Sequence, residues 1–154
     1  MKYLTTNTPI GKLTIAEDNG YITHIFLNGE EPINNHSSET TPLLKKAETQ
    51  LGEYFKGQRT IFDLPIKPNG GPFFQKVWQT MIDKVPFGTT TSYSQIAELV
   101  NSPKACRAIG MANNRNPIPI IIPCHRIVGK NGNLTGFRGG LDMKTKLLKL
   151  EEQA

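Results

Sequence analysis

A cluster of chain-breaking residues near the middle of the sequence divides it into two parts. Residues 67–72, Lys-Pro-Asn-Gly-Gly-Pro, combine two prolines with two glycines, and such a stretch interrupts both helices and strands. The charge balance changes sign at the same place. Residues 1–66 carry six Lys or Arg against eight Asp or Glu, whereas residues 67–154 carry twelve against five. We therefore expect two domains, at 1–66 and 73–154, with a linker at 67–72.

The first 66 residues have the pattern of a small α/β domain. Alternating polar and apolar residues predict three antiparallel strands, at 3–6, 12–17 and 21–27. Thr41-Pro42 is typical of a helix start, and an apolar stripe at helical spacing then continues to Gly57. Residues 60–66 return to the composition of a strand. These elements predict a small antiparallel sheet with one helix.

The second part predicts a mainly helical domain. Apolar residues recur at helical spacing from Phe74 to Ile82, and residues 141–151 form a second amphipathic pattern. Between them, two short helices are expected at 93–100 and 103–112, with Ser102-Pro103 as the start of the second. Two helices joined so tightly are typical of a helix-turn-helix. The fold class expected is thus an α/β N-terminal domain followed by a mainly α, winged-helix-like C-terminal domain.

The composition argues against several classes of protein. No apolar stretch reaches the length of a transmembrane helix, and the N-terminus lacks the apolar block of a signal peptide. Cys106 and Cys124 form no Cys-x-x-Cys pair and no cluster with His24 or His36, so we expect no structural metal and no cofactor. Free thiols suit a reducing compartment, which predicts a cytoplasmic protein that does not bind membranes.

A cysteine and a histidine interrupt the apolar run at residues 120–128. Cys124 precedes His125, and a thiol beside an imidazole has a base within reach, directly or through one water. Taken alone, the pair is equally compatible with a buried structural cysteine. Pro119 and Pro123 disfavour a helix here, so we expect Cys124 at the end of an extended segment. The basic charge of this half favours a polyanionic partner, with nucleic acid first.

A series of short motifs follows in one order over residues 72–151. They are Val85-Pro86-Phe87-Gly88, Ser92-Tyr93-Ser94-Gln95-Ile96-Ala97, Pro103-Lys104-Ala105-Cys106-Arg107-Ala108-Ile109-Gly110, Asn116-Pro117-Ile118-Pro119, Pro123-Cys124-His125-Arg126-Ile127, and Gly139-Gly140-Leu141 with Leu147-Leu148 and Glu151. The series closely resembles the O6-alkylguanine-DNA alkyltransferases, which are suicide DNA-repair proteins. Residues 1–66 resemble that family in architecture only.

The resemblance implies a role for each residue around the cysteine. Cys124 would accept the alkyl group from O6-alkylguanine, and also from O4-alkylthymine, in double-stranded DNA. His125 would act as its base through a water, with Glu151 orienting His125 and Asn116 bracing the segment before the cysteine. A thioether has no easy leaving group, so each molecule would react once. Arg126 is expected to hold the loop by hydrogen bonds.

The target atom lies inside a duplex, so the resemblance also implies that the nucleotide is flipped out through the minor groove. Arg107 would insert into the stack, and Tyr93 would rotate the flanking phosphate and hydrogen-bond the flipped base. The other DNA-binding residues implied are Ser92, Lys104, Ala105, Ala108, Gly110 and Arg115. A substrate loop is implied at Phe137, Arg138 and Gly139, although part of the family has serine at position 138. The protein expected is a monomer whose only partner is damaged DNA.

Two other functions stay open from the residues themselves. A winged-helix regulator could use Cys124 to sense alkylation or oxidation, and a cysteine hydrolase could use Cys124, His125 and Glu151. Alkyltransferase-like proteins, which bind lesions without repairing them, replace the acceptor cysteine, so the presence of Cys124 argues against that class. Cys106 is interpreted as a small packing residue of its helix.

Overall fold

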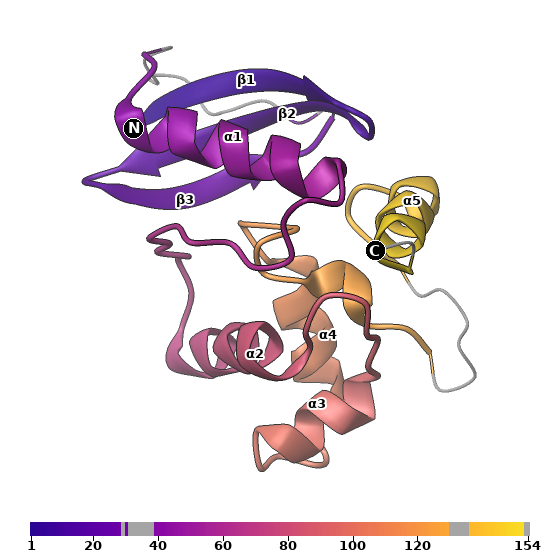
Figure 1. Ribbon diagram of the computed structural model, residues 1–154. Coiled ribbons are helices and arrows are strands. Elements are labelled where there is room, and N and C mark those ends of the chain that lie inside the picture. The colour runs from indigo at the N-terminus through magenta and orange to yellow at the C-terminus, as the bar shows by residue number, and fades with distance from the viewer. Residues whose placement is uncertain (29, 31–38, 130–135, 153–154) are drawn as a thin grey trace. The chain divides into compact units, whose positions relative to one another are not determined.

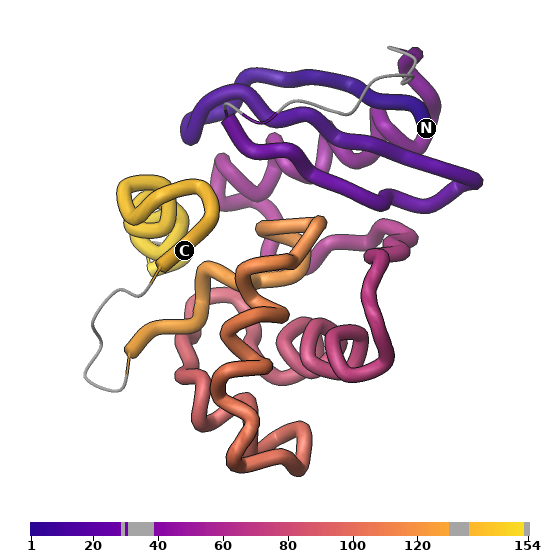
Figure 2. Tube along the Cα trace, turned by 180° about the vertical axis from the view of Figure 1, so that it is seen from behind, coloured from indigo at the N-terminus to yellow at the C-terminus, as the bar shows by residue number. Residues whose placement is uncertain are grey.

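The structure is a computed structural model, and it describes residues 1–28, 30, 39–129 and 136–152. The chain divides into two compact units, Met1–Asn69 and Gly70–Ala154 (Figures 1 and 2). In the part of the chain that is described, no helix is both long enough and apolar enough to cross a membrane.

The first unit is a three-stranded antiparallel sheet with one helix. Its strands are β1 (Lys2–Thr8), β2 (Gly11–Asp18) and β3 (Tyr21–Phe26), in the order β1-β2-β3. Helix α1 (Pro42–Phe55) lies in front of the sheet in Figure 1 and behind it in Figure 2, so it covers one face. Its start is as predicted, because the Thr41 side chain accepts a hydrogen bond from the Leu44 backbone N–H at 3.1 Å.

Residues 60–66 do not form the predicted strand. Only Ile66 makes a bridge, parallel to Ile22, through the 2.8 Å bond from Ile22 N–H to the Pro65 carbonyl and the 2.9 Å bond from Lys67 N–H to the Ile22 carbonyl. Before Ile66, side chains take the place of a neighbouring strand as hydrogen-bond partners of the backbone. The Gln50 amide, for example, accepts from the Asp63 N–H at 2.9 Å and donates to the Asp63 carbonyl at 3.2 Å. Residues 60–66, although their composition is typical of a strand, therefore form a loop that is hydrogen-bonded to α1.

The second unit is built on four helices and one short 3₁₀ turn. The helices are α2 (Pro72–Lys84), α3 (Tyr93–Leu99), α4 (Cys106–Asn114) and α5 (Leu141–Glu152), and the turn is η1 (Cys124–Arg126). Helices α2, α3 and α4 pack on one another. Trp78, at the centre of α2, is 1% exposed and donates its indole N–H to the Ala112 carbonyl of α4 at 2.9 Å. Pro72, expected in the linker, is the first residue of α2.

Helix α4 begins three residues later than predicted. Residues 102–105 form a turn, closed by the 2.9 Å bond from Ala105 N–H to the Ser102 carbonyl, and the helix starts at Cys106. Ser102-Pro103 therefore initiates a turn and not the helix itself. Lys104 consequently lies ahead of α4, whereas Arg107 lies on it.

Candidate active site

The segment before Cys124 is a tight turn and not the extended segment expected. The Ile122 N–H bonds the Ile118 carbonyl at 3.0 Å, and Ile120 has φ +77°, a conformation that strains a β-branched residue. Asn116, 1% exposed, clamps this turn: its side-chain oxygen accepts from the Ile118 N–H at 2.9 Å and its amide donates to the Ile122 carbonyl at 2.9 Å. Pro119 and Pro123 favour extended backbone locally, but the buried Asn116 side chain binds both ends of the segment and holds it as a turn.

Cys124 is the first residue of η1, and its side chain is buried, with 4% of the residue exposed. Burial raises the pKa of the thiol. A side-chain hydrogen bond with Asn116 and the positive charges of Arg138 and Lys144 oppose that rise without cancelling it. The thiol at rest is therefore protonated, and its use as a nucleophile requires a base.

A buried carboxylate organises the residues that follow Cys124. Glu151 of α5 accepts from His125 Nε2 at 2.6 Å, from Arg126 Nε at 2.8 Å and from Arg126 Nη2 at 3.1 Å. Arg126 Nη1 donates to the Val85 carbonyl, which follows α2, at 2.8 Å. Burial alone would raise the pKa of Glu151, but the hydrogen bonds from His125 and Arg126 and the positive charge of Arg126 lower it to about 2. Glu151 is thus ionised and tied to η1 through two side chains.

His125 is a neutral imidazole with a defined tautomer. It is 0% exposed, and burial lowers its pKa even though Glu151 opposes this. Because Arg126 already supplies the positive charge that balances Glu151, the histidine does not need to be protonated. The ionised carboxylate accepts, so Nε2 carries the proton and Nδ1 carries the lone pair. Among the described residues Nδ1 has no hydrogen-bond partner, which leaves it available as a base.

The residues expected to contact DNA lie on α3, α4 and the turn between them. Tyr93 is the first residue of α3 and is half-buried, directly after Ser92, whose hydroxyl caps the helix by accepting from the Gln95 N–H at 3.2 Å. Arg107 is exposed on α4. Exposed Lys104 precedes α4 and exposed Arg115 is its C-cap, while Ala105, Ala108 and Gly110 are half-buried.

Two further sequence features bear on this surface. Cys106 is exposed, so its interpretation as a packing residue was wrong; as the first residue of α4 it points away from the core that Ile109 and Ala112 enter.

Residues 99–141 contain six Lys or Arg and no Asp or Glu. The positive charge of the second unit is therefore concentrated in the segment that carries α4 and η1.

The predicted substrate loop reaches the active-site turn through Arg138. The loop enters α5 by a turn closed by the 2.9 Å bond from Gly140 N–H to the Phe137 carbonyl. Phe137 and Gly139 are half-buried, whereas Arg138 is exposed and donates from Nη1 to the Asn116 carbonyl. Residues 130–135, which precede it in the sequence, lie outside the described part.

Comparisons with known proteins agree with this geometry in both units. Residues 72–153 match the model of the 6-O-methylguanine DNA methyltransferase DNA binding domain, and residues 1–68 match that of the 6-O-methylguanine DNA methyltransferase ribonuclease-like domain. The chain belongs to the 6-O-methylguanine DNA methyltransferase family. Residues 1–66, whose sequence resembled the family in architecture only, are thus matched by a model of the same family.

Individual relatives span nearly the whole chain. The constitutive methylated-DNA–protein-cysteine methyltransferase of Bacillus subtilis is 47% identical, covering 97% of this chain and 94% of the relative. A methylated-DNA–protein-cysteine methyltransferase of Methanosarcina acetivorans is 42% identical, covering 98% of each. The crystal structure of Mycobacterium tuberculosis OGT in complex with DNA superposes with a TM-score of 0.91 at 38% identity, covering 99% of this chain and 94% of that one. The expected fold class is confirmed.

One residue of this methyltransferase-family site was missed by the sequence analysis. Lys144 of α5 is 0% exposed and donates from Nζ to the Ile127 carbonyl. Burial lowers the pKa of Lys144, and Cys124 opposes this, so the two side chains act on each other. The available signal was spacing, because Lys144 and Glu151 lie seven residues apart and share the apolar stripe of α5 with Leu147.

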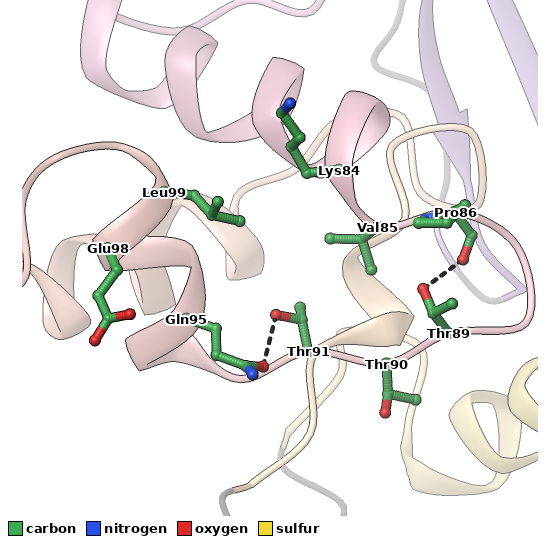
Figure 3. Close-up of a pocket in the computed structure, with 9 residues that line it drawn as sticks. All are labelled: Lys84, Val85, Pro86, Thr89, Thr90, Thr91, Gln95, Glu98 and Leu99. Carbon is green, nitrogen blue, oxygen red and sulfur yellow. Dashed lines mark hydrogen bonds between the residues drawn. The ribbon is translucent and has the colours of Figure 1, made fainter.

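An open pocket beside α3 is separate from these groups (Figure 3). The residues that line it are Lys84, Val85, Pro86, Thr89, Thr90, Thr91, Gln95, Glu98 and Leu99. Its hydroxyl groups are used internally, since Thr91 bonds the Gln95 side chain at 3.1 Å and Thr89 bonds the Pro86 carbonyl at 2.7 Å. None of the predicted catalytic residues lines it. Across the described residues, no group of three His, Cys, Asp or Glu could hold a metal ion, and His36 lies outside them.

Replacing Glu151→Gln should destabilise the protein at neutral pH, because it leaves the Arg126 charge buried without a counter-charge. The folded pKa of about 2 lies below the ordinary 4.5, so this carboxylate stabilises the fold above pH 4.5 and loses that contribution as the pH falls toward 2. At pH 7 the variant should lose about 3 kcal/mol of unfolding free energy, and the difference from wild type should vanish near pH 2. Urea unfolding at a series of pH values measures it.

Exposed Glu152, the next residue of α5, provides the matched control. Glu152→Gln should change the unfolding free energy by less than about 0.5 kcal/mol at every pH. Equal losses in the two variants would show that Glu151 has no special place in the fold.

Proposed function

We propose that this protein repairs alkylated DNA by moving the alkyl group from O6 of guanine to the sulfur of Cys124, once per molecule. The observation that carries the proposal is the buried Cys124–His125–Glu151 arrangement in a chain of the 6-O-methylguanine DNA methyltransferase family. A protonated thiol is followed by a neutral imidazole whose Nδ1 lone pair is free and whose Nε2 is fixed by an ionised carboxylate.

The chemistry begins with one proton transfer. The Cys124 thiol gives its proton to His125 Nδ1 through a water, and Glu151 stabilises the imidazolium that forms. The thiolate then attacks the alkyl carbon in line: the sulfur–carbon bond forms, the carbon–O6 bond breaks, and its electron pair passes to guanine. Guanine takes up one proton, so the net change is alkyl for hydrogen on sulfur.

The protein is consumed in this reaction. Water does not cleave a thioether under ordinary conditions. None of the other proposed catalytic residues is a nucleophile that would remove the alkyl group from the sulfur. Repair is therefore stoichiometric, with one lesion removed per chain. The same displacement at O4-alkylthymine needs no further group, and we include it in the proposed substrate range.

The second unit is the proposed DNA-binding domain. Residues 99–141, which carry six Lys or Arg and no Asp or Glu, suit the phosphate backbone, and exposed Arg107 on α4 would enter the minor groove and replace the flipped base. Tyr93 supplies the hydrogen bond to the flipped base. Phe137, Arg138 and Gly139 would contact that base from the loop, and Ser92, Lys104, Ala105, Ala108, Gly110 and Arg115 would contact the backbone and groove. One chain and one duplex suffice, so we propose a monomer that works on DNA in the cytoplasm.

Intact mass spectrometry tests the transfer directly. After incubation with a duplex containing one O6-methylguanine, wild-type protein should gain the mass of one methyl group on the peptide that holds Cys124, and the gain should saturate at one per chain. Cys124→Ser should gain none, because a neutral hydroxyl is a far weaker nucleophile than a thiolate. Cys106→Ser removes the exposed thiol and should react as wild type does.

Several outcomes would contradict the proposal. Methylation elsewhere in the chain would exclude Cys124 as the acceptor. Tight lesion binding without any mass gain would favour a sensor, and multiple turnovers on esters or peptides would favour a hydrolase.

Arg107→Ala should separate base flipping from chemistry. Without the inserted side chain, repair of duplex DNA should slow by about tenfold or more, since flipping costs a few kcal/mol and each 1.4 kcal/mol is a factor of ten. Reaction with the free base O6-benzylguanine needs no flipping and should stay within about twofold of wild type. Single-turnover kinetics on both substrates measure the two effects.

The control for this variant is Lys149→Ala, which removes one exposed positive charge from α5. It should leave both rates near the wild-type values. If Arg107→Ala slowed both substrates equally, its role in flipping would be refuted.

A further inference from the structure

Arg138 links the substrate loop to the residue that holds the nucleophile. Its Nη1 donates to the backbone carbonyl of Asn116. The side chain of the same asparagine clamps the turn before Cys124 and opposes the rise in the pKa of the thiol. One residue thus stands between the loop guanidinium and the sulfur, and the contact joins segments 22 residues apart.

Arg138 is also the more permanent of two positive charges that act on the thiol. Arg138 and Lys144 both favour the thiolate of Cys124. Burial lowers the pKa of Lys144, which favours its neutral form, whereas a guanidinium stays protonated in proteins. The other charged groups close by, Arg126 and Glu151, neutralise each other in a bidentate pair.

We propose that Arg138 is a positioning residue that couples the substrate loop to the nucleophile: it holds the loop on Asn116 and brings a permanent positive charge to the thiolate of Cys124. This inference rests on the proposed function. It also gives the loop a second task, because the Arg138 charge that it carries stabilises the thiolate once His125 has taken the proton from Cys124. Arginine in place of the serine found in part of the family then changes how the nucleophile is activated.

The consequence is a shift in the pH dependence of Cys124 reactivity. A positive charge near a thiol stabilises its anion and lowers the pH at which it reacts, so removal of the charge moves the profile to higher pH. His125, Lys144 and the Arg126–Glu151 pair are the other titratable and charged groups of the site, and they are unchanged in Arg138 variants. Any shift in those variants therefore reports on Arg138.

The experiment follows the rate of Cys124 modification against pH with two probes that need no DNA, O6-benzylguanine and iodoacetamide. Arg138→Ala and Arg138→Gln should shift the profile upward by about one pH unit, a rate about tenfold lower at pH 7. Glutamine keeps an N–H donor for the Asn116 carbonyl but loses the positive charge. Lysine keeps the positive charge but loses the planar guanidinium with its several N–H donors. The lysine variant should therefore stay close to wild type in its profile.

The control is Lys146→Ala, an exposed positive charge on α5 whose loss should leave the profile in place. A lower rate at every pH without a shift in Arg138→Ala would overturn the inference in favour of a structural role. An equal shift in Arg138→Lys and Arg138→Ala would overturn it too, as would an equal shift in Lys146→Ala. If wild type gained no methyl group from the O6-methylguanine duplex, the proposed function would fail, and the iodoacetamide profiles would still decide the role of Arg138.

Discussion

The ionised carboxylate of Glu151 is the interaction on which the second unit depends. It lies 3% exposed on α5, and its two oxygens accept hydrogen bonds from both of the side chains that follow Cys124. Through Arg126 it also reaches the Val85 carbonyl after α2. A buried charge is tolerated only when it is paired and hydrogen-bonded, and here the partners are the two side chains next to Cys124 in the sequence. The groups that stabilise the fold therefore also fix the orientation of His125.

The site keeps its reactive groups uncharged until they are used. Burial favours the thiol form of Cys124 and the neutral form of His125, while Glu151 and Arg126 carry their charges as a pair. Each molecule reacts once, so a permanently ionised thiolate would be consumed by reaction with other electrophiles in solution. A protonated resting thiol, with a base and positive charges close to it, limits the reaction to a substrate held in the site.

The sequence predicted the elements with local causes and missed those decided by distant contacts. The strands, α1 and the helix-turn-helix follow from periodicity, from the Thr41 cap and from the Ser92 cap, all of which act over a few residues. The strand at 60–66 failed because Gln50 binds that backbone, and the extended segment before Cys124 failed because Asn116 closes a turn there. Lys144 escaped notice because its partners, Ile127 and Cys124, are brought to it only by the fold.

The proposed reaction requires His125 to be a neutral base with its proton on Nε2 and its lone pair on Nδ1. Nitrogen-15 NMR of the imidazole ring, recorded from pH 5 to 8 on protein labelled at histidine, tests this most directly. We expect His125 to show the Nε2–H tautomer at neutral pH and to take up a proton only below the ordinary histidine pKa of about 6.5. An Nδ1–H tautomer, or an imidazolium at pH 7, would contradict it.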